Sequence, residues 1–285
     1  MELVSIIIVN YNSGVLLERC IRSVCANVDV PCEVIVVDNS SDDDSLEFLK
    51  ALPRPAHLSV NLIEAGGNLG FARANNLGAK HANGRILHFL NPDTRVCAPM
   101  PEAYRSIMAR ELYDAIYITP LVDENGRPAA AKFVLPLIHN YARALMGRTD
   151  IGYWYLGASL VMPRRLFERL GGWPADYFMY AEDLDLFFQA ARLNIPVITT
   201  DAPVIHTAGG TTSRAWTELE REIRREASIA KFYRKHDMLS QYVVVTLVQL
   251  MRQLLTEPSG FWRRLKILWS LGKRTWHCDT VLERS

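Results

Sequence analysis

The residues best suited to chemistry in this sequence are carboxylates that follow apolar stretches. Asp93 comes just after residues 86–90, an apolar run that ends at Asn91 and Pro92, because proline cannot donate to a sheet and restricts the residue before it. A carboxylate at the carboxyl end of a strand can hold a divalent cation against a diphosphate, since ligands of open α/β sheets gather at that edge. Asn91 and Asp93 are also common in ordinary turns, so this tripeptide alone leaves both interpretations open.

A second group of carboxylates lies in residues 176–189, where Glu182, Asp183 and Asp185 fall in the first turn of an expected helix. Acidic side chains at that end are stabilised by the helix dipole, which would be a purely structural role. The same stretch contains five aromatic residues, and a partly desolvated aspartate among them can act as a general base. The pattern therefore leaves a structural and a catalytic role open.

Polar residues that suit a nucleotide follow two other apolar stretches. Glycine-rich residues 65–70 precede an alanine-rich helix expected at 71–82, so free N–H groups and a positive helix end would meet a phosphate, with Arg73 as a bidentate partner. Asp38, which ends another apolar run, suits hydrogen bonds to a base or ribose, or the cap of the next helix. His206, a lone histidine before a small polar loop, is by itself more typical of a structural residue.

The order of the expected elements indicates an α/β fold. Apolar residues 3–9 and 32–37 predict parallel strands buried on both faces, and a helical pattern lies between them. A strand, a helix and a strand with polar residues at the strand ends are typical of a nucleotide-binding half. Residues 153–162 predict one further strand, and from residue 214 the pattern is helical.

Length and composition exclude several classes of protein. The 285 residues are 49% hydrophobic and 22% charged, which excludes disordered and fibrous proteins and predicts one domain or two closely packed halves. The five cysteines have no zinc-binding spacing, which predicts reduced thiols in a cytosolic protein. We expect no signal peptide, and no spanning helix, because the apolar-rich residues 242–250 fall short of the ~20 residues that a span requires.

The net charge of +1 is the sum of two unlike parts. Residues 214–285 contain 14 Lys and Arg against 8 Asp and Glu, whereas residues 1–213 contain 18 against 23. A helix over residues 261–276 would place its aromatic side chains on one side and its basic side chains on the other, which suits a membrane interface as well as an ordinary packing helix. We expect this tail to contact anionic lipid rather than nucleic acid.

Six stretches taken together resemble the inverting glycosyltransferases of the large GT-A family that includes bacterial rhamnosyltransferases. They are VSIIIVNYNS, VIVVDNSS, GGNLGFARANN, FLNPDT, GGWPADYFMYAEDLDL and HTAGGTTS, in chain order over roughly residues 3–213. The resemblance implies a GT-A domain with a mostly parallel central sheet at residues 1–213. Its nucleotide-sugar half would be residues 1–95 and its acceptor half residues 96–213, and residues 214–285 would form a basic helical tail.

The resemblance also implies roles for single residues. Asp183 falls at the catalytic base, and Asp93 and His206 fall at ligands of a divalent metal, Mg²⁺ or Mn²⁺. Asn91 stands where the family's Asp-x-Asp motif has its first acid, so the metal would have fewer anionic ligands. The nucleotide sugar would contact Asn10, Tyr11, Asn12, Asp38, Asn68, Gly70, Arg73 and Asn91. The acceptor would contact Glu182, Trp154 and Trp173, although both tryptophans are at least as typical of a core.

The implied reaction is a single displacement that moves L-rhamnose from dTDP-rhamnose to a hydroxyl of a glycan or polyprenyl-linked acceptor at the cytoplasmic face of the membrane. It requires Asp93, Asp183 and His206 to converge on one cavity. A sugar nucleotidyltransferase is an alternative, but it would need a glycine-rich basic loop after the first strand, and NYNSGVLLE is neither. A second alternative is a non-catalytic sugar-nucleotide-binding protein, which Asn91 suggests because it replaces an acid of the family motif. The presence of Asp93, Asp183 and His206 together favours an enzyme over this alternative.

Overall fold

The computed structural model describes the whole chain except residues 1, 98–99, 110–113, 149–151, 208–215 and 275–285. Its centre is a seven-stranded sheet in the order β11-β6-β10-β4-β1-β2-β3. The strands are β1 (Val4–Asn10), β2 (Cys32–Asp38), β3 (Leu58–Glu64), β4 (Ile86–Leu90), β6 (Ile116–Ile118), β10 (Ser159–Pro163) and β11 (Val197–Thr199). Strands β1 to β4 are parallel and β10 is antiparallel to both of its neighbours, which confirms the expected mostly parallel sheet.

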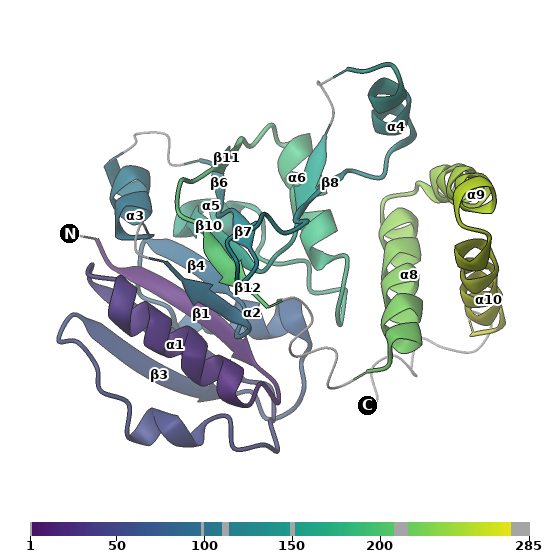
Figure 1. The fold of residues 1–285 in the computed structure, drawn as a ribbon. Coiled ribbons are helices and arrows are strands. Elements are labelled where there is room, and N and C mark those ends of the chain that lie inside the picture. The colour runs from purple at the N-terminus through teal and green to yellow at the C-terminus, as the bar shows by residue number, and fades with distance from the viewer. Residues whose placement is uncertain (1, 98–99, 110–113, 149–151, 208–215, 275–285) are drawn as a thin grey trace.

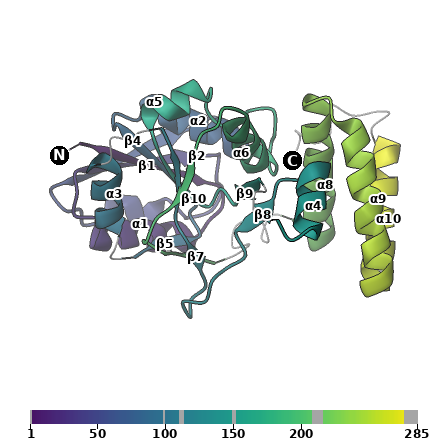
Figure 2. The same ribbon diagram turned by 90° about the horizontal axis from the view of Figure 1, so that it is seen from above.

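Helices cover both faces of this sheet, because the side chains of an apolar strand alternate between the faces. Ile6 and Ile8 of β1 belong to one core cluster and Ile7 belongs to the other. The first cluster includes α1 (Val15–Asn27) and α3 (Met100–Ala109), and the second includes α2 (Phe71–His81), α5 (Arg164–Arg169) and α6 (Glu182–Arg192). Figure 2 shows the two helical layers on opposite sides of the sheet.

Two small sheets stand beside the central one. The first has the order β5-β12-β7, and the second pairs β8 with β9 in antiparallel fashion. Their strands are β5 (Thr94–Val96), β7 (Leu121–Val122), β8 (Lys132–Val134), β9 (Tyr153–Tyr155) and β12 (Val204–His206), and η1 (Glu47–Lys50) and α4 (Ile138–Leu145) are the remaining short helices. The continuous strand expected at 153–162 is wrong, because a turn around Gly157 divides it into β9 and β10.

The C-terminal helices confirm the expected helical tail. They are α8 (Glu218–Lys235), α9 (Leu239–Thr256) and α10 (Pro258–Arg274), and each contacts the other two. Figures 1 and 2 place them at one end of the molecule, far from α1 and β3. No helix in the described ranges combines the length and the hydropathy that a membrane span needs.

The buried His88 on β4 predicts a pH-dependent stability. Its Nδ1 lies 2.6 Å from the Tyr104 hydroxyl and its Nε2 lies 2.8 Å from the Ser159 hydroxyl, and burial lowers its pKa to about 3. The unfolded chain takes up this proton near pH 6.5, so the free energy of unfolding falls as the pH drops from 6.5 toward 3. We expect a loss of about 2 kcal/mol from this group between pH 7 and pH 5.

Urea unfolding of the protein and of His88→Gln at several pH values measures this effect. The slope of unfolding free energy against pH should be smaller in the variant by about one proton between pH 6 and pH 4. Equal slopes in the two proteins would contradict the assignment to His88.

Candidate active site

Asp93 and His206 meet at the carboxyl edge of the central sheet. Strand β12 pairs antiparallel with β5, so His206 lies opposite Thr94, and the Thr207 N–H donates to the Asp93 carbonyl. The His206 Nε2 is 3.5 Å from the Asp93 Oδ1, and both side chains are more than nine-tenths buried. This Oδ1 accepts no hydrogen bond from the described residues. A buried carboxylate oxygen without a donor is costly, and a cation would satisfy it.

The turn that presents Asp93 is fixed by its backbone. The Asn91 N–H donates to the Ala158 carbonyl at 2.9 Å, and the Asn91 carbonyl accepts hydrogen bonds from the N–H and the hydroxyl of Thr94. Pro92 ends β4 between these contacts, as the sequence predicts. The Asn91 side chain lies half-buried in the same turn.

Asp183 lies in the first turn of α6, behind an unusual stretch of backbone. Tyr180 and Ala181 both adopt left-handed conformations, with φ of 68° and 65°, and such strain is typical of functional sites. The Asp183 Oδ2 accepts the Gly157 N–H at 3.2 Å, and its Oδ1 accepts the Leu184 N–H at 2.8 Å. A fixed carboxylate of this kind can receive a proton without reorganisation.

Burial shifts the pKa values of two neighbouring acids, Asp183 and Glu182. Burial raises the pKa of Asp183 to about 6, although the N–H groups of Leu184 and Gly157 and the charge of Arg225 oppose that rise. Burial, followed by the negative charge of Asp183, raises the pKa of Glu182 well above its usual value. The arrangement therefore favours ionisation of Asp183, whose carboxylate accepts two N–H groups, as a general base requires.

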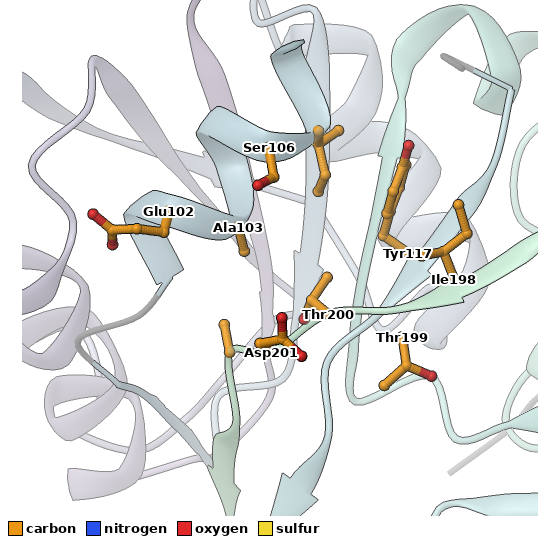
Figure 3. A pocket seen from close by; sticks show the side chains of 10 residues that line it. Glu102, Ala103, Ser106, Tyr117, Ile198, Thr199, Thr200 and Asp201 are labelled. Atoms are coloured by element: carbon orange, nitrogen blue, oxygen red, sulfur yellow. The ribbon is translucent and has the colours of Figure 1, made fainter. Parts of the chain in front are cut away.

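Two hydrogen bonds from adjacent residues connect Asp183 to the turn of Asp93. Gly157 binds Asp183, and the next residue, Ala158, binds Asn91. The segments that carry Asp93, Asp183 and His206 are thus neighbours at one edge of the sheet. Two cavities lie elsewhere in the described structure, and neither is lined by these three residues. One, of about 130 Å³, lies between α3, Tyr117 and Asp201 (Figure 3), and the other, of about 340 Å³, lies around Pro120 and Leu156. The expected single cavity for all three residues stays a prediction.

The residues assigned to the nucleoside gather at the ends of β1 and β2. The Asn10 Nδ2 donates to the Asp38 Oδ1 at 2.9 Å and also reaches the hydroxyls of Ser41 and Ser45. Asp38 also accepts the Ser41 N–H in the turn after its strand. It does not cap the next helix, because η1 begins after Leu46 without a side-chain cap. The Asn10 Oδ1 is buried and has no hydrogen-bond donor among the described residues. Contact with a nucleoside stays a prediction.

The next two residues of this turn lie beside the same group. Tyr11 is half-buried, and Asn12 adopts a φ of 48° while its Oδ1 accepts the Asp42 N–H. The Asn12 N–H donates to the Ser41 hydroxyl at 3.0 Å. The loops after β1 and β2 are therefore bound to each other, as a shared nucleotide pocket requires.

The glycine-rich loop packs against the segment that leads to the base. Gly70 has a φ of 76°, and a Cβ there would lie 2.2 Å from the Phe178 carbonyl oxygen, so only glycine fits. The Asn68 Oδ1 accepts the Gly70 N–H. Asn39, which the sequence analysis did not single out, accepts the Leu69 N–H and donates to the Gly70 carbonyl. The only signal for Asn39 is its position next to Asp38 at a strand end.

Two residues assigned from the sequence have other partners. Arg73 is exposed and donates its Nε–H to the Ala175 carbonyl, so contact with a diphosphate stays a prediction. Trp173 is 1% exposed and lies edge-on between Phe71 and Phe89, with ring centroids 5.3 and 5.4 Å away. The acceptor role of Trp173 is therefore corrected to a core role, because no ring face is left for a sugar.

Trp154 and Glu182 occupy different surroundings. Trp154 is half-buried and stacks on Phe133 at a centroid distance of 4.7 Å. Glu182 is 7% exposed, and its Oε2 has no hydrogen-bond partner among the described residues. Both positions are compatible with an acceptor, and both assignments stay predictions.

Helix α8 contributes groups that the sequence analysis assigned to a separate tail. The Arg225 guanidinium lies 5.5 Å from the Tyr180 ring centroid and is the cation that lowers the pKa of Asp183. Farther along α8, the Ser228 hydroxyl donates to the Met179 carbonyl and Lys231 donates to the Asp176 carbonyl. Helix α8 therefore holds the loop that precedes Asp183.

A fully buried carboxylate fixes the end of α8 to α6. Asp185 accepts hydrogen bonds from Lys235 at 2.8 Å, from His236 at 2.7 Å and from the Tyr177 hydroxyl at 3.0 Å. Gln189 of α6 donates to the same carboxylate at 3.1 Å. Two residues of the tail thus bind a side chain that lies two positions after Asp183.

Comparison with known proteins agrees with this geometry. Residues 5–120 match the family described as Glycosyl transferase family 2. Agl10 of Haloferax volcanii, a low-salt glycan biosynthesis hexosyltransferase, is 27% identical over 207 residues, which are 68% of this chain and 63% of that protein. An N-acetylglucosaminyl-diphospho-decaprenol L-rhamnosyltransferase of Mycobacterium tuberculosis is 25% identical over 248 residues, 75% of this chain and 78% of that protein. The chain thus spans less than two thirds of the length of Agl10.

The solved structures agree on the fold. The mannosyltransferase PcManGT of Pyrobaculum calidifontis, in complex with GDP-Man and Mn²⁺, superimposes with a TM-score of 0.59 at 19% identity, over 97% of this chain and 76% of that one. The fold is that of the GT-A glycosyltransferases, and the family match at residues 5–120 indicates a nucleotide-sugar glycosyltransferase. Within that class, residues 5–120 of this chain are similar to glycosyltransferase family 2.

Proposed function

We propose that this protein transfers a sugar from a nucleoside diphosphate to an acceptor hydroxyl by a single displacement with inversion. The observation that supports this most is the buried pair of Asp93 and His206 next to the segment bound by Asp183, in which the Asp93 Oδ1 accepts no hydrogen bond from the described residues. The acceptor oxygen attacks the anomeric carbon, the bond from that carbon to the diphosphate oxygen breaks, and the acceptor proton passes to Asp183. A positioned carboxylate base contributes roughly 10²–10⁴-fold to such a step.

Asp93 and His206 would hold a divalent metal, Mg²⁺ or Mn²⁺. Their oxygen and nitrogen atoms suit either ion, and the orphaned Asp93 Oδ1 fits a cation. No third His, Cys, Asp or Glu side chain joins them among the described residues, so oxygens of the diphosphate would complete the coordination. When bound, the metal would neutralise charge on the departing nucleoside diphosphate.

The donor that we propose is dTDP-rhamnose, and the acceptor is a sugar on a polyprenyl diphosphate. The similarity to the mycobacterial rhamnosyltransferase supports both, since its name gives a rhamnose donor group and a diphospho-decaprenol acceptor. The named ligands of the structural relatives, GDP-Man and UDP-GlcNAc, supply the competing donors. An acceptor of this kind would place the enzyme at the cytoplasmic face of a membrane, in peripheral contact through its C-terminal helices.

A donor screen tests the proposal without knowledge of the acceptor. The protein with Mn²⁺ is mixed with dTDP-rhamnose, GDP-Man or UDP-GlcNAc, and its melting temperature and slow donor hydrolysis are measured. A bound ligand raises the melting temperature according to its affinity, so dTDP-rhamnose should give the largest rise. If another donor stabilises the protein most, the rhamnose assignment is wrong, and if none does, the proposed function itself fails.

Replacement of the metal ligand is a separate prediction. Asp93→Asn should weaken binding of dTDP in the presence of Mn²⁺ on the order of tenfold, because one charged ligand is lost. Titration calorimetry with and without Mn²⁺ measures the change, and Asp201→Asn, an exposed carboxylate in the acceptor half, is the matched control. Equal Mn²⁺ dependence in Asp93→Asn and the parent protein would remove Asp93 from the metal site.

A further inference from the structure

The outer face of α9 is apolar along its length and is left uncovered by the described chain. Seven aliphatic side chains on it are between 42% and 81% exposed: Val243, Val244, Leu247, Val248, Met251, Leu254 and Leu255. They recur at the spacing of one helical face, and the opposite side of α9 buries Val245 and Leu250. Because α9 already packs through that opposite side on α4, α8 and α10, the fold does not need the exposed face.

Helix α10 extends this apolar region with aromatic residues. Trp262 and Trp269 are 63% and 65% exposed, two turns apart on one side of the helix, and the exposed Lys266 lies between them. Tryptophan rings beside a lysine are typical of helices that lie in a membrane interface, where the rings enter the headgroup region and the cation stays in water.

The basic side of α10 is partly used inside the protein. Arg263 pairs with Glu218 and Glu222 of α8, and Arg264 pairs with Glu226. This part of the basic side therefore packs inside the protein, as the ordinary packing helix left open by the sequence would, because the acidic side of α8 lies against it. Trp276 belongs to the expected aromatic face but lies outside the described residues.

Charge favours an anionic partner for the surface that remains. Residues 239–274 contain six basic residues and one acidic residue, Glu257. Arg252 on α9 and Lys266 on α10 are exposed. An apolar face edged by cations attracts a bilayer that contains anionic lipid through both hydrophobic and electrostatic terms.

We propose that the outer face of α9, together with the Trp262 and Trp269 side of α10, is a docking surface for an anionic lipid bilayer. We call it the α9–α10 surface. This inference specifies which surface would make the membrane contact of the proposed function. It rests on the proposed function only for the reason that such contact is useful, namely that a polyprenyl-linked acceptor would lie in the same membrane. A second copy of the chain is the competing occupant, and the experiment separates the two.

Vesicle sedimentation tests the α9–α10 surface with the full chain. The protein should bind vesicles of phosphatidylcholine with 30% phosphatidylglycerol, and bind pure phosphatidylcholine at least tenfold more weakly. Replacing Leu247 and Met251 together by Asp should lower binding to the anionic vesicles at least tenfold. The matched control is Leu193→Asp at the end of α6, where the side chain is 54% exposed outside the surface, and binding should be unchanged.

Two further measurements distinguish a lipid bilayer from a second copy of the chain as the occupant of this surface. Light scattering of the free protein should give a monomer, and Trp fluorescence should be quenched by brominated lipid. A dimer that the double Asp variant dissociates, with no vesicle binding by the parent, would assign the surface to a second copy and overturn the proposal. Donor hydrolysis should be equal in all variants, so a failure of lipid binding is distinguishable from a failure of the proposed catalysis.

Discussion

Asp183→Asn should reduce sugar transfer by about 10²–10⁴-fold while leaving nucleotide-sugar binding nearly unchanged, because only the step that removes the acceptor proton is lost. The carboxylate is held by the Gly157 and Leu184 N–H groups, and the amide of asparagine fits the same space with one of these contacts kept. The measurement is kcat with a saturating acceptor, together with the dissociation constant of the donor by calorimetry.

The pH dependence of the parent enzyme gives a second measure of the same residue. Burial raises the pKa of Asp183 to about 6, and a base works only when ionised, so kcat/KM should fall about tenfold per pH unit below pH 6. This acidic limb should be absent from the residual activity of Asp183→Asn. Undiminished transfer by the variant, or an unchanged acidic limb, would show that another group accepts the proton.

Asp185→Ala should destabilise the protein by about 3–5 kcal/mol, because it leaves Lys235 and His236 facing a buried site without their carboxylate. Asp185 is 0% exposed, and burial makes the loss of one partner far more damaging than the loss of a surface pair. The melting temperature should fall by roughly 10 °C, and hydrogen exchange should accelerate in α8.

The matched control for Asp185 is its exposed counterpart. Asp176 also pairs with Lys235 but at the surface, so Asp176→Ala should cost less than about 1 kcal/mol. Replacing Asp185, Lys235 and His236 together by leucine should recover much of the stability, since no unpaired charge remains. If Asp185→Ala melts with the parent protein, α8 is held by its apolar contacts alone.

The parts of the fold that could be predicted from sequence are those governed by local patterns. The apolar runs of β1, β2 and β4 are buried on both sides, and the proline after β4 ends that strand where expected. The division of residues 153–162 was missed, since Gly157 follows an unbroken apolar pattern and its turn depends on the distant Asp183. The hydrophobic pattern of a single stretch does not reveal a hydrogen bond to a residue that is distant in the sequence, such as the one from Gly157 to Asp183.

The candidate site divides in the same way. The pairing of Asp93 with His206 was expected only from the family resemblance, because the two lie more than a hundred residues apart and their contact depends on how β12 pairs with β5. The family resemblance implies contact between Trp173 and the acceptor, and the structure instead buries this side chain against Phe71 and Phe89. The link from Lys235 to Asp185 joins two separately predicted elements, which no periodicity can connect.

The Asp185 contacts have a consequence for how the chain can be divided. A fragment that stops at residue 213 would keep the buried Asp185 carboxylate of α6 but lose Lys235 and His236, which both bind it. It would also expose the Phe188 ring that packs against Phe232. Such a fragment should therefore be recovered as an insoluble or molten species. The family match ends at residue 120, but we expect the smallest piece able to fold cooperatively to reach at least to His236.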